Sequence, residues 1–376
     1  MHAFALVFLA AAHAPIEIGA DPHTLYARLA SQVEAAYDSA RGGFVLKSQV
    51  PVESAVELAF RQAASHAPGS WLHEAETTLR WTHGLMDTLT GGYVQSGNLG
   101  DADKGSMDKR ADSNGRRLEL LVTAWQSTGD DGYRREAARV VDWADRVLLD
   151  GRGGFVSAQV GDRELVPADN GPIVHAWLAW AAATHDAARK NFALRSLDRV
   201  WDECWMEKLG LVRRNEMGDI AKEPRLEDQV EMGRAYLLAA RLCGRPEDGE
   251  RASQIGDLVL QRFVEPNGSF RSQSTPNKNG SIKKAKSVAS ENAHAARFLC
   301  ELSELTQDAK YRAAAGRAIE PFAKDMAKAG LEAANWALAV RASYDPDLPG
   351  RGDWVAAAKD DEPAPRKRSV RFHLGH

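Results

Sequence analysis

Four clusters of carboxylate and amide side chains in this sequence have the residue types that acid/base chemistry needs. Each cluster stands just before a run with the apolar spacing of a helix. Hydrolysis of a glycosidic bond requires one carboxyl group as acid and a second as base or nucleophile across a cavity. The candidates for that catalytic role are Asp112, Glu227, Asp228 and Glu291, and the candidates for substrate binding are Asp108, Lys109, Asn114, Asp169, Asn170, Asn292 and His294.

The same residue types also have a purely structural use. Asp, Asn and Ser are ordinary N-cap residues, and Glu suits the first turn of a helix. For any one cluster, capping is the more frequent role. Their recurrence in four successive repeats favours a shared pocket.

Histidines and tryptophans offer further candidates. His83, His175 and His294 could carry protons, although His175 lies in an apolar run where a core histidine is more common. Several tryptophans could form platforms on which sugars stack, but large aromatics at helical spacing more often belong to the core. These tryptophans are Trp81, Trp177, Trp180, Trp201 and Trp205.

A repeated loop indicates which elements position these residues. Gly42-Gly43-Phe44-Val45 recurs as Gly91-Gly92-Tyr93-Val94 and Gly153-Gly154-Phe155-Val156, and more loosely at 209–212 and 267–270. A period of roughly 50–60 residues is typical of a repeat array. Glycine permits a tight turn, after which the aromatic or apolar residue can pack onto the core.

Between these loops the apolar spacing is helical. Leu118, Leu121, Val122 and Trp125 follow the i, i+3, i+4, i+7 pattern, and a second stripe begins at Tyr133. One unit is therefore a helix, a polar turn, a second helix and a Gly-Gly-aromatic loop. Five units carry the loop, and a final helix pair is expected between Ser290 and Tyr344.

The repeats predict an all-α chain that forms an (α/α)6 toroid with short β-turn loops. Neither end has an obviously polar capping repeat, which favours a closed ring over an open helical array, the alternative architecture. In such a ring the loops before the inner helices gather at one mouth. We expect the candidate side chains to gather there.

Composition excludes some classes of function. A formal net charge of −4 provides no global basic field for nucleic acid. Cys204, Cys243 and Cys300 are far apart, without redox or zinc-ligand spacing, so we expect buried thiols, no thiol redox activity, no cofactor and no metal. The expected partners are a carbohydrate or other small molecule and, on a second hypothesis, a protein.

The two ends of the chain are expected to lie outside the toroid, which we assign to residues 21–345. Residues 1–20 fit either a signal peptide or a strand hairpin, Phe4 to Leu9 and Ile16 to Ile18. The location is accordingly cytoplasmic or exported. No other apolar run is long enough to span a membrane. Residues 346–376, with the basic run Arg366-Lys367-Arg368, are expected to form a disordered tail.

The ordered succession of these motifs resembles the helical region of the thioredoxin-domain-containing, spermatogenesis-associated protein family. The motifs that carry the resemblance are Tyr37-Asp38, Gly42-Gly43-Phe44, Asp108-Lys109, Asn114, Leu118 to Trp125, Thr128-Gly129-Asp130, Gly153 to Gln159, Asn170-Gly171, Leu226-Glu227-Asp228 and Ser290-Glu291-Asn292. The resemblance implies a six-hairpin, glycosidase-like toroid behind a thioredoxin-like domain. A carbohydrate-related role follows by analogy of fold.

The sequence also departs from the pattern of that family. We expect no complete thioredoxin-like domain in this sequence, because the stretch Phe4 to Ile18 resembles only the closing hairpin of such a domain. The family's His-Phe-Glu-Lys-Met-Leu-Tyr-Asp run is here Ser106 to Ser113. Two hypotheses follow. One is a sugar-binding or glycosidase- or epimerase-like toroid, and the other is a non-catalytic scaffold whose chemistry has decayed.

Overall fold

The computed structural model describes residues 21–46, 50–95, 108–160, 164–214, 218, 223–274 and 288–344. Residues 1–20, predicted to form a leader or a strand hairpin, and residues 346–376, the expected tail, lie wholly outside these ranges. The run from Ser106 to Ser113, which departs from the family pattern, lies partly outside them.

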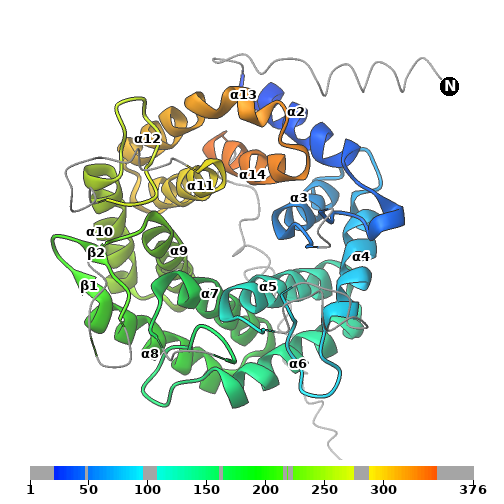
Figure 1. Ribbon diagram of the computed structural model, residues 1–376, viewed down its shortest axis with the longest axis horizontal. Helices are drawn as coiled ribbons and strands as arrows, with labels where there is room; N and C mark the ends of the chain where they lie inside the picture. The colour runs from blue at the N-terminus through cyan, green and yellow to red at the C-terminus, as the bar shows by residue number, and fades with distance from the viewer. Residues whose placement is uncertain are drawn as a thin grey trace, which may run out of the picture.

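The described helices form a ring of two concentric layers (Figure 1). The inner helices are α3 (Glu53–Ala64), α5 (Ala111–Thr128), α7 (Pro167–Thr184), α9 (Leu226–Cys243), α11 (Ala289–Thr306) and α14 (Ala333–Tyr344). The outer layer holds α2 (Pro22–Ala35), α4 (Trp71–Thr82), α6 (Asp131–Val147), α8 (Ala187–Cys204), α10 (Pro246–Arg262), α12 (Ala309–Ile319) and the short α13 (Ala323–Met326). The chain has the (α/α)6 toroid fold that its repeats predict.

The sixth hairpin of the ring joins the two ends of the described chain. Helix α11 packs against α12, as expected for a helix pair in the last part of the sequence. Helix α14 then serves as an inner helix, and the helix that covers it is α2 (Figure 1). The ring is therefore closed by non-covalent packing between segments about 300 residues apart.

The Gly-Gly-aromatic loops are short antiparallel turns. Four of them are single bridges, for example Met86 to Tyr93 and Leu149 to Phe155. The remaining loop, at residues 209–212, belongs to a two-stranded hairpin of β1 (Trp205–Met206) and β2 (Gly210–Leu211). Gly92 shows why glycine is required, because its φ is 74° and a Cβ there would lie 2.5 Å from the indole ring of Trp143.

Glycine also allows inner helices to approach each other closely. A Cβ on Gly171 of α7 would lie 2.4 Å from the backbone carbon of Glu231 in α9. A Cβ on Gly115 of α5 would meet the backbone of Ile173 in α7 at 2.6 Å. The second turns of these three helices therefore touch backbone to backbone, and this brings their side chains together inside the ring.

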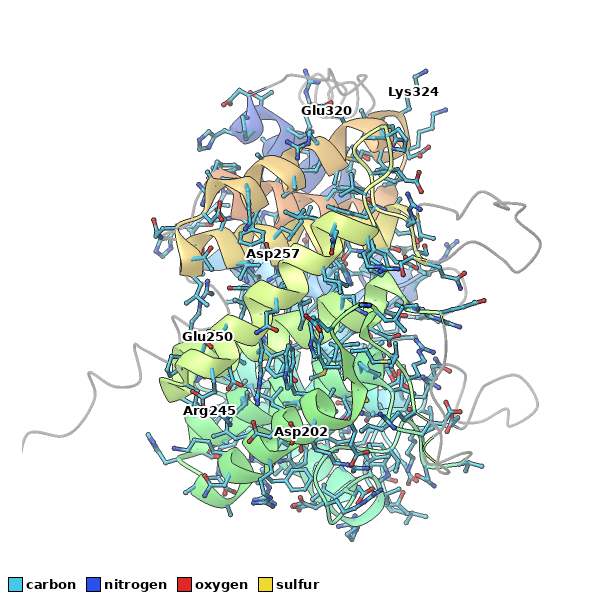
Figure 2. The ribbon with its side chains drawn as sticks, turned by 90° about the vertical axis from the view of Figure 1, so that its left-hand side faces the viewer. Asp202, Arg245, Glu250, Asp257, Glu320 and Lys324 are labelled. Atoms are coloured by element: carbon cyan, nitrogen blue, oxygen red, sulfur yellow. The ribbon has the colours of Figure 1, made fainter. Side chains whose placement is uncertain are left out.

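The outer helix α6 is strongly amphipathic and the inner helix α7 is not. The stripe predicted from Tyr133 through Val140, Val141 and Ala144 is buried in α6, whereas α7 is buried on nearly every side. Charged residues of the outer helices, such as Glu250 and Asp257 of α10, lie on the outside of the ring (Figure 2). None of the described helices is both long and apolar enough to cross a bilayer.

Candidate functional site

The four inner helices α5, α7, α9 and α11 share one register. Each is 18 residues long and is the first described helix that follows a repeat loop. Residues at the same position in different helices therefore lie at similar depth. Counted from the first residue, positions 2, 6 and 9 follow the i, i+4, i+7 spacing of a single helical face.

The first layer, at the mouth, is acidic with arginine partners. It contains Asp112 and Glu227, both at position 2. Arg110 places Nε 3.2 Å from Oδ1 of Asp112 and Nη2 3.1 Å from Oδ1 of Asp169, which joins the starts of α5 and α7. Arg213 lies 3.9 Å from Glu227, too far for a strong pair.

Glu227 combines exposure with an altered acidity. Its side chain is 48% exposed. Desolvation by the surrounding protein, together with the negative charges of Glu231 and Asp228, nevertheless raises its pKa to about 7. Glu227 therefore lies among protein groups but is reached by solvent, and it can take up or release a proton near neutral pH.

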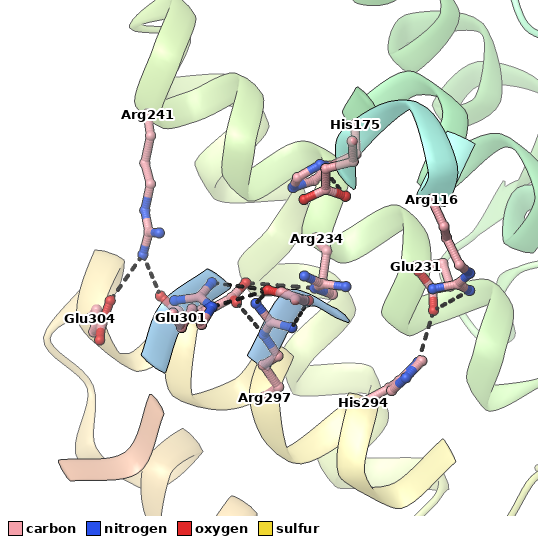
Figure 3. A network of polar contacts seen from close by, with 12 residues as sticks. Arg116, His175, Glu231, Arg234, Arg241, His294, Arg297, Glu301 and Glu304 are labelled. Atoms are coloured by element: carbon pink, nitrogen blue, oxygen red, sulfur yellow. Dashed lines mark hydrogen bonds and ion pairs between the residues drawn. The ribbon is translucent and has the colours of Figure 1, made fainter. Parts of the chain in front are cut away.

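The second layer contains a chain of polar contacts from α5 to α14, of which Figure 3 shows Arg116, Glu231 and His294. Arg116 donates from Nη2 to Oε1 of Glu231 at 3.0 Å, and the same oxygen lies 3.1 Å from Nδ1 of His294. The other ring nitrogen of His294, Nε2, lies 3.1 Å from Oδ1 of Asn335. Both ring nitrogens thus face oxygen atoms, and these two contacts fix the orientation of the ring.

This chain of contacts lies inside the ring. Arg116, Glu231 and His294 are each the sixth residue of their helix. Helix α7 separates α5 from α9 in the inner layer (Figure 1). The ion pair between Arg116 and Glu231 therefore has to cross the side of α7 that faces the interior of the ring. The side chains at position 6 therefore face the interior.

Electrostatics keep Glu231 ionised. Burial alone would raise the pKa of its carboxyl group, but the charges of Arg116, His294 and Arg234 hold that pKa well below its usual range. The pKa of Arg116 is raised by Glu231 and Asp112 against the effect of burial. The result is a fixed anion that orients His294.

Three of the predicted substrate-binding residues are asparagines whose side chains hydrogen-bond to the backbone of a repeat loop. Asn114, Asn170 and Asn292 occupy position 4, where the side chain faces the preceding loop and is fully buried. Each amide accepts from the backbone N–H of the loop's aromatic residue and donates to the carbonyl of that same residue, for Asn170 and Phe155 at 2.8 and 2.9 Å. Gln229 makes the same pair of bonds with Leu211. We call this arrangement the amide clamp.

Other predicted residues are also held by local partners. Asp228 is buried, accepts from the backbone N–H of Ala168 at 3.0 Å, and so caps the neighbouring helix α7. Lys109 is buried and donates to Asp87, Thr90 and the carbonyl of Gly91, which ties down a repeat loop.

Two more predicted residues stand close to the mouth. Asp108 lies just before α5, and its carbonyl accepts from the backbone N–H of Gln95. Glu291 is the third residue of α11, and its Oε2 is buried without a hydrogen bond among the described residues.

The remaining histidine and tryptophan candidates divide by location. His83 contacts Glu136 in the outer layer, and His175 is buried 3.5 Å from Glu119. Trp177 is buried against Phe155, and Trp201 stacks on Trp205. The described part of the chain holds no group of three or more potential metal ligands. Cys204 and Cys300 are buried, and burial raises the pKa of each thiol to about 12.

Sequence reasoning missed Arg116, Glu231 and Asn335. Arg116 and Glu231 each lie one helical turn after a predicted carboxylate, at Asp112 and Glu227. Alignment of the helix starts across repeats would have placed Arg116, Glu231 and His294 in one layer. Asn335 had no such signal, because no repeat loop precedes α14.

Comparison with known proteins supports the fold. No family model matches this sequence, and neither does any curated protein. Among solved structures, the cellobiose 2-epimerase from Bacillus thermoamylovorans is similar with a TM-score of 0.64 at 14% identity, over 86% of this chain and 87% of that one. A GH76 alpha-mannanase from Bacteroides thetaiotaomicron has a TM-score of 0.65 at 11% identity, over 88% and 98% of the two chains. A D-mannose isomerase has a TM-score of 0.64 at 12% identity, over 80% and 86%.

Proposed function

We propose that this protein is a carbohydrate-active enzyme that moves protons on a bound sugar, as an epimerase or isomerase does. The observation that carries the proposal is the Glu231–His294 pair, with Glu227 one helical turn nearer the mouth. The similar structures include epimerases, an isomerase and a mannanase, which adds support by analogy of fold.

The two proposed proton carriers have complementary states. Glu227, with a pKa of about 7, is partly ionised at neutral pH and can accept a proton from a carbon next to a carbonyl group. To His294, whose ring nitrogens each lie 3.1 Å from an oxygen of Glu231 or Asn335, we assign the transfer of a proton to the other face of the sugar. Glu231 orients the ring, and Arg116 holds Glu231 in place.

Proton transfer fits these residues better than hydrolysis. A glycosidase needs a second carboxylate that is free to attack the sugar or activate water. Glu231 is buried and bonded to both Arg116 and His294. Asp112, which contacts Arg110, is the carboxylate at the mouth that could replace it, and we propose that Asp112 and Glu291 contact the substrate.

The test is an exchange experiment in D2O. The protein is incubated with free aldoses and ketoses, including D-mannose, D-glucose, D-fructose and cellobiose, and NMR follows deuterium at the carbon next to the carbonyl. We expect incorporation that falls about 10²–10⁴-fold in the His294→Gln variant. His83→Gln is the matched control, because His83 also pairs with a carboxylate, Glu136 at 3.0 Å, but in the outer layer.

Other outcomes separate the alternatives. New reducing ends from oligosaccharides without deuterium uptake would assign hydrolysis in place of proton transfer. If no tested sugar reacts and none binds, the carbohydrate proposal is wrong and the scaffold hypothesis is favoured.

We also infer kinship with the helical region of the thioredoxin-domain-containing family named above. Its support is the order of the shared motifs from Tyr37 to Asn292. An alignment of that family tests the inference, which fails if its inner helices lack the amide at position 4.

A further inference from the structure

A third layer of charged residues lies below His294. It consists of the ninth residues of the four long inner helices, and every one of them is ionisable. They are Glu119, His175, Arg234 and Arg297. Partners from α3 and from lower in α11 complete the layer, because Arg297 donates to both carboxylate oxygens of Glu57 at 2.6 and 3.0 Å and Arg234 lies 3.7 Å from Glu301. Figure 3 shows Arg234, Arg297 and Glu301 together.

The third layer crosses the interior of the ring. Glu57 belongs to α3 and Arg297 to α11, and α14 stands between these helices in the inner layer (Figure 1). Their ion pair therefore crosses the side of α14 that faces the interior of the ring. The ion pair between Arg116 and Glu231 crosses α7 in the same way, one layer higher. Helices α3, α5, α7, α9 and α11 all contribute side chains at this depth.

Solvent exposure has a minimum at this layer. The exposed fraction of the side chain falls from 48% for Glu227 in the first layer to 29% for His294 and 4% for Glu231 in the second. In the third layer it is 9% or less for the four ninth-position residues and for Glu57, and 20% for Glu301, which lies lower in α11. Beyond the layer it rises again, to 31% for Arg241 at position 16 of α9. Solvent thus reaches the interior from both ends and is excluded in the middle.

We infer that the candidate site is a blind recess with the third layer as its floor, so that it takes a free sugar or the end of a sugar chain and not the interior of a polysaccharide. This inference rests on the proposed function. A polymer could pass through the ring only by separating buried ion pairs, which leaves uncompensated charges behind. The sugar therefore enters and leaves through the mouth that bears Asp112 and Glu227.

The first experiment measures what a polysaccharide presents to the site. An α-mannan and a series of cello-oligosaccharides are prepared at several mean lengths, and binding is followed by calorimetry with D-mannose and cellobiose as short probes. We expect half-saturation at a constant concentration of chain ends, whatever the length. Half-saturation at a constant concentration of sugar residues would overturn the blind recess but leave the proposed function standing. Absence of binding by every probe, the short ones included, would overturn both.

The second experiment blocks each end of the ring separately. In a Cys243→Ser background, which removes the partly exposed native thiol, Ser290→Cys places a thiol on the exposed second residue of α11 at the mouth. Arg241→Cys is the matched variant at the opposite end. Each is labelled with a polyethylene-glycol maleimide, and binding of the best short probe is measured before and after.

The two labels should have opposite effects. We expect at least a tenfold loss of affinity after labelling at position 290 and less than a twofold change after labelling at position 241. A loss on labelling position 241, or no loss on labelling position 290, would overturn the inference.

Discussion

At the scale of single residues, the site depends on one carboxylate that makes an ion pair with an arginine and a hydrogen bond with a histidine. Glu231 is buried between Arg116 and His294, and both contacts are made by its Oε1. A buried ion pair stabilises a fold only weakly compared with apolar packing, but breaking one side of it leaves a buried charge alone. Glu231 therefore contributes both to the stability of the fold and to the proposed chemistry.

We predict that Glu231→Gln destabilises the protein by roughly 3–5 kcal/mol at pH 7, because Arg116 loses its buried counter-ion. The folded-state pKa of Glu231 lies well below its ordinary value of 4.5. Its stabilisation is therefore fully present above about pH 4.5 and declines as the pH falls from there toward the folded-state pKa. Urea unfolding at several pH values should show the gap between variant and parent narrowing below pH 4.5.

Glu227→Gln is the matched control for that prediction, one turn earlier on the same helix. Its side chain is about half exposed, so we expect a change of about 0.5 kcal/mol or less at pH 7. Equal losses for the two variants would show that Glu231 has no special ionic role.

At the scale of elements, the amide clamp joins each inner helix to the loop before it. The same side-chain position holds an amide in α5, α7, α9 and α11, and each amide satisfies both backbone groups of a buried loop residue. The clamp fixes where each helix starts relative to the ring. It therefore also fixes the depth at which the side chains of positions 2 and 6 stand.

We predict that Asn170→Ala lowers the free energy of unfolding by roughly 2–4 kcal/mol. The substitution leaves the N–H and C=O of Phe155 buried without partners, and each unsatisfied group costs about 1–3 kcal/mol. Asn191→Ala in α8 is the control, since Asn191 is exposed and the chemical change is identical. A similar loss for both variants in urea unfolding would mean that the clamp carries no stability of its own.

At the scale of the whole molecule, the packing of α2 on α14 closes the ring. Arg341 of α14 donates to the hydroxyl of Tyr26 in α2 at 2.7 Å, and that hydroxyl donates to Gln62 of α3 at 2.9 Å. In an open array the first helix would be an end, and damage there would stay local. In this closed ring the first helix, α2, packs against the last helix, α14, and so is not an end.

We predict that Leu29→Ala in α2, where Leu29 is fully buried, destabilises the whole ring by roughly 2–5 kcal/mol. Hydrogen exchange followed by mass spectrometry should show faster exchange in α7, across the ring from α2, as well as in α2 and α14. Leu72→Ala in α4 is the control, because Leu72 is 39% exposed. Faster exchange confined to α2 and α14 would contradict a cooperative ring.

The sequence by itself determined the elements and their repetition. Helical spacing of apolar residues and Gly-Gly turns are local properties, so the stripe from Tyr133 and the loops at Gly92 and Gly154 could be predicted without any tertiary information. The placement of the acidic and amide clusters at helix starts was readable for the same reason.

Only the tertiary structure decided which residue of each cluster faces the interior. Neighbouring residues on a helix point in directions about 100° apart, so Glu227 and Glu231 face the lumen while Gln229 turns to the loop, although all three are polar. The partner of Glu231 lies 115 residues away in Arg116, and Asn335 reaches His294 from a helix that α2 covers. These contacts depend on the curvature that brings six hairpins around to close on themselves, which is a property of packing and of no single segment.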